Sequence, residues 1–257
     1  MTGFEFSDGM FQDVGWLMRE TEALYTRIVN KHGEAKALLP LTADRIVSTR
    51  NWEPAMPVIQ ANLHPVLDEL KVFFVPKVMK PGPAIVFPQR DIAGNFTRAR
   101  LKPLFDLNVQ GSDVKYAALG VKQMWKGPNW FGNSIENSER LLKHKAVVLV
   151  EGPFDLLACR LLCPDLPVMS TGTKALSAKH LDYLQIMGVK RILLMWDNEM
   201  EKGKSGGNHA MATTTRRLEQ DGRFSARTLL CPEHDPSTCL ERYSTAFALR
   251  NSLRAMA

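Results

Sequence analysis

The chain has 257 residues, of which 45% are hydrophobic and 23% are charged, a composition typical of a globular protein. Its formal net charge of +6 is compatible with a polyanionic partner but does not require one. No apolar run approaches the roughly 20 residues of a membrane-spanning helix. The N-terminal residues lack the basic start and apolar core of a secretory signal. We therefore expect a cytoplasmic, non-secreted protein without a membrane partner.

Residues 1–70 are expected to form a helical N-terminal segment. Apolar residues recur at near-helical spacing over residues 8–31. A second helix is predicted around residues 43–48 with Thr42 as its N-cap. A third covers about residues 56–70 and should be interrupted near Pro65. Nothing in this segment suggests chemistry.

Residues 71–140 are expected to form a basic α+β subdomain. Between Lys71 and Gly127 there are ten lysines and arginines against three aspartates. Apolar runs and a period-two pattern predict strands at 72–75, 84–88 and 96–102. The last of these strands would carry several cations on one face, which could contact phosphates or could be the solvated outer face of an antiparallel sheet.

Residues 106–140 look loop-rich. Within them, Lys115, Lys122 and Lys126 are interleaved with the aromatic residues Tyr116 and Trp125. Cations mixed with aromatic rings can hold nucleotides by charge and stacking. Alternatively, the aromatic side chains simply fix the loop to the body of the protein.

From residue 141 to 235, short strands and helices alternate, which is typical of a parallel α/β unit. A short helical tail is expected over 236–257. The four cysteines fit neither a zinc site nor a disulfide framework, so we expect packed thiols at Cys159, Cys163, Cys231 and Cys239. The predicted strands are 146–150, 166–170, 191–196 and 225–230, and the predicted helices are 154–162, 177–188 and 209–220.

Two of these strands end in acids. Glu151 follows the strand 146–150, with Asp155 four residues later, and Asp197 and Glu199 follow the strand 191–196. In open α/β sheets, ligands bind at the carboxyl ends of the strands. Carboxylates there suit a hard cation such as Mg²⁺, although such acids can also be ordinary helix-start residues. The absence of a histidine cluster argues against a zinc hydrolase.

The order Glu151-Gly152-x-x-Asp155, then Ser170-Thr171-Gly172-Thr173, then Asp197-Asn198-Glu199 is similar to the TOPRIM fold. Topoisomerases, bacterial-type primases and certain nucleases share that fold. Further blocks over about residues 84–250 narrow the resemblance to the bacterial and phage primases. Residues 86–94 resemble the F-P-I-R-D-x-x-G segment of these primases, 115–132 their K-Y…F-h-K-G…L-Y-G stretch (h apolar or His), 170–177 their S-L-G-T-A-L-T block, and 234–237 their D-P-D segment.

This resemblance implies a mostly parallel TOPRIM-type sheet with flanking helices over 141–235, preceded by the basic α+β subdomain and the helical N-terminal segment. It implies a DNA-directed RNA primase that makes short RNA primers on single-stranded DNA from ribonucleoside triphosphates. Mg²⁺ or Mn²⁺ would be the cofactor, with no zinc site evident, and a replicative helicase acting in trans would be a further partner.

The same resemblance implies roles for individual residues. Glu151 would help to bind metal or move the proton of the attacking 3′-hydroxyl. Asp197 and Glu199 would hold the metal, and Asp155 and Asp235 would complete the acidic cluster. The cations implied to face the template and the incoming nucleotide are Arg90, Arg98, Arg100, Lys102, Lys115 and Lys126.

The sequence also departs from the family pattern. The usual D-x-D is Asp197-Asn198-Glu199, and Ser237 replaces an aspartate, which puts a metal position in doubt. A short insertion with Lys202 and Lys204 could bind phosphates or merely lengthen a loop. The family's zinc module, helicase domain and sizeable helicase-binding domain have no counterpart, so we expect a primase core that is either minimal or part of a longer protein.

Two alternatives are compatible with these departures. A TOPRIM nuclease would use the same acids and metal to cleave phosphodiesters. A catalytically weak DNA-binding replication accessory protein would retain DNA binding without relying on Glu151.

Overall fold

The structure is a computed structural model, and it describes residues 38–75, 84–90, 96–104, 108–109, 112–113, 117–119, 130–198 and 206–255. Several predictions lie outside these residues. They are the helix over 8–31 and the roles of Lys115, Lys122, Lys126, Glu199, Lys202 and Lys204.

The described chain begins with helices α2 (Leu38–Arg50) and α3 (Met56–Leu70), joined through the 3-10 turn η2 (Glu53–Ala55). The predicted interruption at Pro65 is wrong, because α3 continues through this residue. The buried face of α3, which includes Leu63 and Leu67, packs against α5 (Pro153–Leu162), and this packing offsets the hydrogen bond that proline cannot make.

Thr42 is not the N-cap of the second helix, as predicted, but lies inside α2. Its buried hydroxyl accepts a hydrogen bond from the backbone N–H of Phe74 at 3.1 Å. The hydroxyl therefore satisfies a buried backbone donor of the first strand rather than a donor at a helix end.

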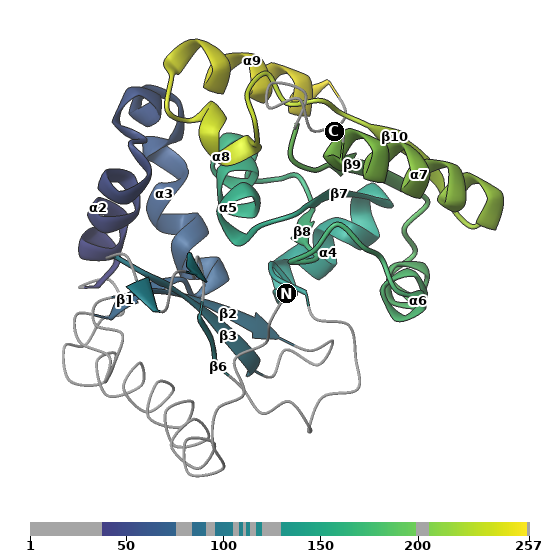
Figure 1. Cartoon of the computed structure of the whole chain (residues 1–257), viewed down its shortest axis with the longest axis horizontal. Coiled ribbons are helices and arrows are strands. Elements are labelled where there is room, and N and C mark those ends of the chain that lie inside the picture. Colours follow the sequence, from purple (N-terminus) through teal and green to yellow (C-terminus); the bar gives the residue numbers. More distant parts are fainter. Residues whose placement is uncertain are drawn as a thin grey trace.

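An antiparallel sheet follows in the order β1-β2-β3-β6 (Figure 1), and β4 pairs with β5 in a separate two-stranded sheet. Ile85 and Phe87 of β2 are buried and pair with Lys102 and Arg100 of β3. Residues paired across an antiparallel ladder share a face. The ring of Phe87 packs edge-on against the ring of Phe154 in α5, with 4.9 Å between the ring centroids. Positions 100 and 102 therefore lie on the face of the sheet that meets α5. The strands are β1 (Phe73–Val75), β2 (Ala84–Arg90), β3 (Phe96–Pro103), β4 (Asn108–Val109), β5 (Ser112–Asp113) and β6 (Ala117–Leu119).

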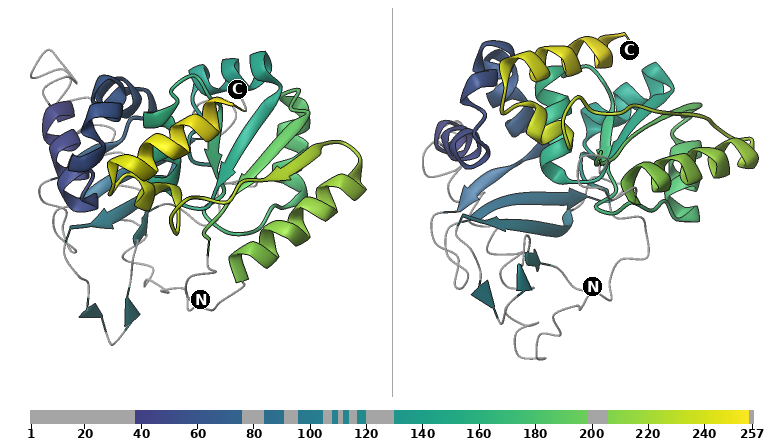
Figure 2. Two further views of the ribbon diagram at one scale, coloured as in Figure 1. Left: turned by 90° about the horizontal axis from the view of Figure 1, so that it is seen from above. Right: turned by 45° about the horizontal axis from the view of Figure 1, so that its top comes forward.

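The second sheet is entirely parallel, in the order β10-β9-β7-β8, as the TOPRIM-type prediction requires. Helices cover both of its faces (Figure 2). Buried residues of α4, α6 and α7 form one core, and those of α5, α8 and α9 form another with α2 and α3. The remaining elements are α4 (Ile135–His144), β7 (Ala146–Val150), β8 (Val168–Ser170), α6 (Ala178–Ile186), β9 (Arg191–Met195), α7 (Gly206–Asp221), β10 (Ser225–Thr228), α8 (Pro236–Cys239) and α9 (Tyr243–Arg254).

Helix α4 corrects the expectation that residues 106–140 are loop-rich throughout. Ser134 caps this helix by accepting a hydrogen bond from the backbone N–H of Asn137 at 3.0 Å. Two of its large apolar residues, Ile135 and Leu142, are exposed, so the segment lacks a continuous apolar stripe.

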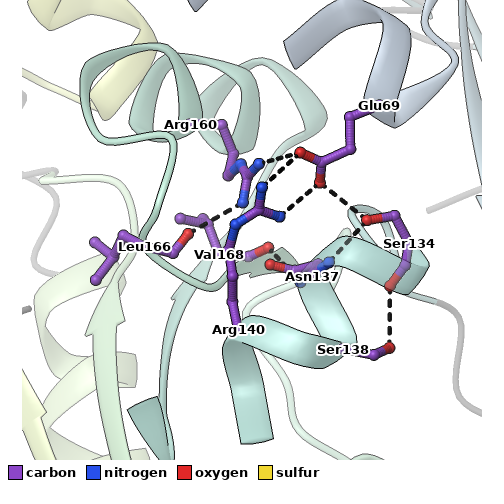
Figure 3. Close-up of polar contacts among 8 residues, drawn as sticks. All are labelled: Glu69, Ser134, Asn137, Ser138, Arg140, Arg160, Leu166 and Val168. Carbon is purple, nitrogen blue, oxygen red and sulfur yellow. Dashed lines mark hydrogen bonds and ion pairs between the residues drawn. The ribbon is translucent and has the colours of Figure 1, made fainter. Parts of the chain in front are cut away.

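A partly buried charge network joins α3 to α4 and α5 (Figure 3). The Glu69 carboxylate accepts two hydrogen bonds from Arg140, both at 2.9 Å, and one from Arg160 at 2.5 Å. It also accepts one from the hydroxyl of Ser134 at 2.9 Å. The network anchors the helical N-terminal segment to the parallel-sheet unit, and no sequence pattern predicted it.

The four cysteines are free and buried, which confirms the prediction of packed thiols. Among the described helices, none has the length and apolar character needed to cross a membrane.

Candidate active site

Glu151 and Asp197, two of the acids predicted from the sequence, follow strands that end at one edge of the parallel sheet. Val150 of β7 pairs with Met195 of β9 on one side and with Ser170 of β8 on the other. The three strands therefore end side by side, and Glu151 follows the middle one. The hydroxyl of Ser170 donates a hydrogen bond to the backbone carbonyl of Glu151 at 2.7 Å, which fixes the two strand ends to each other.

Three aspartates gather beside this edge. Asp155 is buried in the first turn of α5. Burial and the negative charges of Asp235 and Asp197 raise the pKa of the Asp155 carboxyl well above its usual value. Hydrogen bonds from the backbone N–H groups of Gly152, at 2.8 Å, and Ser237, at 3.4 Å, partly oppose this rise. The fold thus brings three of the predicted acids within electrostatic reach of one another.

Gly152 leaves room for the Asp155 carboxylate next to this cluster. A Cβ atom at this position would lie 2.7 Å from Oδ2 of Asp155, closer than such contacts occur. The same oxygen accepts the hydrogen bond from the N–H of Gly152. The glycine in the Glu-Gly-x-x-Asp motif therefore lets the carboxylate fold back over the start of α5.

Asp197 and Asp235 are brought together by contacts between two loops. The backbone N–H of Asn198 donates to the carbonyl of His234 at 2.5 Å, and Nδ1 of His234 lies 2.9 Å from the carbonyl oxygen of Asn198. Nε2 of the same histidine lies 3.7 Å from Oδ2 of Asp197. Because Asp235 directly follows His234, these contacts hold both acids at the same edge.

Asp235 is also the N-cap of α8. Its Oδ1 atom accepts hydrogen bonds from the backbone N–H of Thr238 at 2.6 Å and from the hydroxyl of Thr238 at 2.7 Å. The cap orients the aspartate and gives an acceptor to a backbone N–H group in the first turn of α8, the helix that carries Ser237.

The end of α2, a segment in which no sequence feature suggested chemistry, contacts Ser237 next to Asp235. Arg50 donates to the hydroxyl of Ser237 from Nε at 3.0 Å and from Nη2 at 2.6 Å. Trp52 donates from Nε1 to the carbonyl of Ser237 at 2.9 Å. The Ser237 hydroxyl therefore acts as a hydrogen-bond acceptor for α2.

Lys174 is a further residue that was not among the predicted site residues. Its Nζ atom lies 3.7 Å from Oε2 of Glu151. The sequence distinguishes this position, because Lys174 is an extra residue in the block 170–177, which resembles the shorter segment S-L-G-T-A-L-T. Arg50 carries no comparable signal, since it lies 187 positions from its partner Ser237.

The acids fit a divalent cation in donor type and in charge. Carboxylate oxygens are the ligands that Mg²⁺ and Mn²⁺ favour. A cation beside Asp155, Asp197 and Asp235 would oppose the repulsion that raises the Asp155 pKa. Within the described part of the chain, no three acid, histidine or cysteine side chains lie close enough to enclose a metal ion, and Glu199 lies outside that part.

The predicted phosphate contacts are only partly described. Arg90 lies in β2, and Arg98 and Arg100 lie in β3. Lys102, also in β3, is half-buried. Contact of these residues with a template or a nucleotide stays a prediction.

No known family model and no curated protein matches the sequence. Solved structures do match it in fold. The RNA polymerase domain of Mycobacterium tuberculosis primase DnaG with double-stranded DNA has a TM-score of 0.57 and 16% identity, over 87% of this chain and 81% of that chain. A DnaG primase catalytic domain bound to single-stranded DNA has a TM-score of 0.55 and 16% identity, over 83% of this chain and 73% of that chain. The primase fragment of the bacteriophage T7 primase-helicase has a TM-score of 0.50 and 18% identity, over 73% of this chain and 69% of that chain.

Proposed function

We propose that this chain, which has the fold of a DNA primase catalytic core, synthesises short RNA primers on single-stranded DNA. The observation that carries the proposal is the cluster of Asp155, Asp197 and Asp235 at the carboxyl edge of the parallel sheet. Ligands bind at this edge in open α/β sheets. The likeness to solved primase cores over most of the chain supports the same assignment.

The reaction would be nucleotidyl transfer. The 3′-oxygen of the growing primer forms a bond to the α-phosphorus of the incoming ribonucleoside triphosphate, and the bond to the leaving pyrophosphate breaks. A bound Mg²⁺ or Mn²⁺ would supply the positive charge that activates the attacking oxygen and stabilises the leaving group. Asp155, Asp197, Glu199 and Asp235 would hold this ion, and Glu151 would assist them or take the proton from the 3′-hydroxyl.

The basic subdomain over residues 71–140 would hold the template and the incoming triphosphate. Register places position 100 and Lys102 on the face of β3 that meets α5, the helix that begins directly after Glu151 and Gly152. Cations on this face would therefore lie on the side of the sheet toward the acids. The residues with this role would be Arg90, Arg98, Arg100, Lys102, Lys115 and Lys126. A replicative helicase in trans would be a further partner, and the protein would act in the cytoplasm of a bacterial or phage-infected cell.

A primer-synthesis assay tests this function. The protein is supplied with single-stranded DNA, the four ribonucleotides and Mg²⁺ or Mn²⁺, and labelled products are separated by size. We expect short RNA products that disappear in Glu151→Gln and Asp197→Asn. Matched controls are Glu139→Gln and Asp165→Asn, which remove the same groups from exposed positions outside the site and should leave synthesis intact.

Other outcomes of this assay contradict the proposal. Shortened input DNA without new oligomers would identify a nuclease. Binding of DNA without either product, unchanged in Glu151→Gln, would identify an accessory DNA-binding protein.

A further inference from the structure

Lys174 places a positive charge directly at the predicted catalytic acid. Its ammonium group lies 3.7 Å from the Glu151 carboxylate, and the two side chains are 27% and 29% exposed. Lys174 belongs to the loop between β8 and α6, and Glu151 follows β7. Because β7 and β8 are neighbouring parallel strands, the pair lies at the carboxyl edge of the sheet, where ligands bind.

The loop that carries Lys174 is fixed in place at both ends. At its start, the hydroxyl of Ser170 donates to the carbonyl of Glu151 and accepts a hydrogen bond from the N–H of Gly172 at 3.2 Å. Near its end, Nη2 of Arg217 donates to the carbonyl of Leu176 at 2.7 Å. The position of the lysine is therefore set by the backbone and does not depend on the ion pair alone.

The ion pair between Lys174 and Glu151 is weak enough for Glu151 to exchange Lys174 for another cation. Partly exposed pairs contribute about 0–1 kcal/mol, because water screens the charges and two side chains lose freedom. A divalent cation attracts a carboxylate more strongly than an ammonium group does. Glu151, once engaged with such a cation, would no longer hold Lys174, whose three N–H donors suit the oxygens of a phosphate.

We propose that Lys174 is a nucleotide-binding residue, held by Glu151 in the resting protein and transferred to the triphosphate of the incoming nucleotide when Glu151 binds metal. This inference rests on the proposed primase function. It makes Lys174 a competitor of the metal for Glu151 and a contributor to triphosphate binding. The two effects have opposite signs, and this separates the proposal from a merely structural role.

Two binding measurements test the proposal. The first measures the affinity for Mn²⁺ alone, from the electron paramagnetic resonance signal of the free ion. The second measures the affinity for a fluorescently labelled ribonucleoside triphosphate at saturating Mn²⁺. Lys174→Ala should weaken triphosphate binding about tenfold, the loss expected from one charge-assisted hydrogen bond. Its affinity for Mn²⁺ alone should exceed that of the unaltered protein, because the competing charge is removed from Glu151.

The matched control is Lys190→Ala, which removes the same exposed charge just before β9, at the opposite edge of the sheet. It should change neither affinity. Lys174→Arg, which keeps the charge, should recover part of the triphosphate affinity.

Two results would overturn the proposal. One is triphosphate binding in Lys174→Ala that equals the control. The other is an affinity for Mn²⁺ alone that falls as far as in Glu151→Gln, which would make Lys174 a support for the metal site. Lys174→Gln and thermal unfolding of each variant guard against misfolding of the alanine variant. If the unaltered protein binds no triphosphate and makes no primers, the primase function fails. If it does both and Lys174→Ala does so equally well, the role of Lys174 alone fails.

Discussion

Arg50 donates two hydrogen bonds to the hydroxyl of Ser237, and the backbone N–H of Ser237 donates to Asp155 at 3.4 Å. Arg50 also lies over the ring of Phe154, 5.0 Å from its centroid. The guanidinium group is thus held between the start of α5 and the start of α8. This contact ties the N-terminal helices to the segment that carries the acidic cluster.

Ser237→Ala should lower the free energy of unfolding by about 1–3 kcal/mol, because the half-buried guanidinium of Arg50 loses its acceptor. Urea unfolding measures this loss. Ser244→Ala, at an exposed position in α9, is the control and should change little. In the double variant with Arg50→Ala, the effect of Ser237→Ala should largely vanish, and additive losses would contradict a direct interaction. Mn²⁺ affinity should stay unchanged in Ser237→Ala, since its hydroxyl is engaged with Arg50.

Glu69→Ala should lower the free energy of unfolding by about 3–5 kcal/mol, because it leaves a buried guanidinium without its counter-charge. The side chain of Arg160 is 1% exposed, and its pKa, lowered to about 10 chiefly by burial, leaves it charged at neutral pH. The neighbouring Asp68→Ala is the control. Asp68 pairs with Lys71 at half-exposed positions, so its loss should cost less than about 1 kcal/mol. Equal losses in the two variants would rule out a stabilising role for this charge network.

Asp155 should contribute a loss of stability to the metal-free protein as the pH rises above the ordinary carboxyl pKa of 3.8. The folded state raises the Asp155 pKa and so keeps its proton over a pH range in which the unfolded state has lost it. Within that range, one such proton changes the unfolding free energy by about 1.4 kcal/mol per pH unit.

Urea unfolding with a chelator at several pH values tests this effect. Asp155→Asn should flatten the profile, whereas Asp165→Asn, at an exposed position, should not. Mg²⁺ should restore stability at neutral pH in the unaltered protein, because ligands that bind the folded state stabilise it. Identical profiles for the protein and Asp155→Asn would contradict the shifted pKa.

Gly132→Ala should lower the free energy of unfolding by more than about 2 kcal/mol, because backbone strain and a clash act together. Gly132 has a φ of +83°, and an added Cβ would lie 2.9 Å from the carbonyl oxygen of Val168 and 2.5 Å from Cδ1 of Leu156. Gly222 has a similar φ of +74° but open space around it. Gly222→Ala should therefore cost only about 1 kcal/mol, the strain by itself. Equal costs would show that the crowding at Gly132 is relieved by small shifts.

Much of the parallel-sheet unit was predictable from local pattern. The apolar run 146–150 and the cap at Ser177 were enough to predict β7 and the start of α6, because strand periodicity and helix capping depend on neighbouring residues. The shared edge of Glu151 and Asp197 was also predictable, since parallel strands that are neighbours end on the same side.

The contact that links the N-terminal helices to the site could not be read from the sequence. Arg50 reaches Ser237 through the packing of elements that are distant in the chain, whereas Lys174, which pairs with Glu151, stands out in the sequence as an extra residue in the block 170–177. The continuation of α3 through Pro65 likewise depends on burial against α5 and overrides a local helix-breaking signal. The periodicity of apolar residues indicates which side of a helix or strand is buried. It does not indicate which other element packs against that side. The acids and their common edge therefore follow from the order of residues, whereas their counter-charges follow from long-range packing.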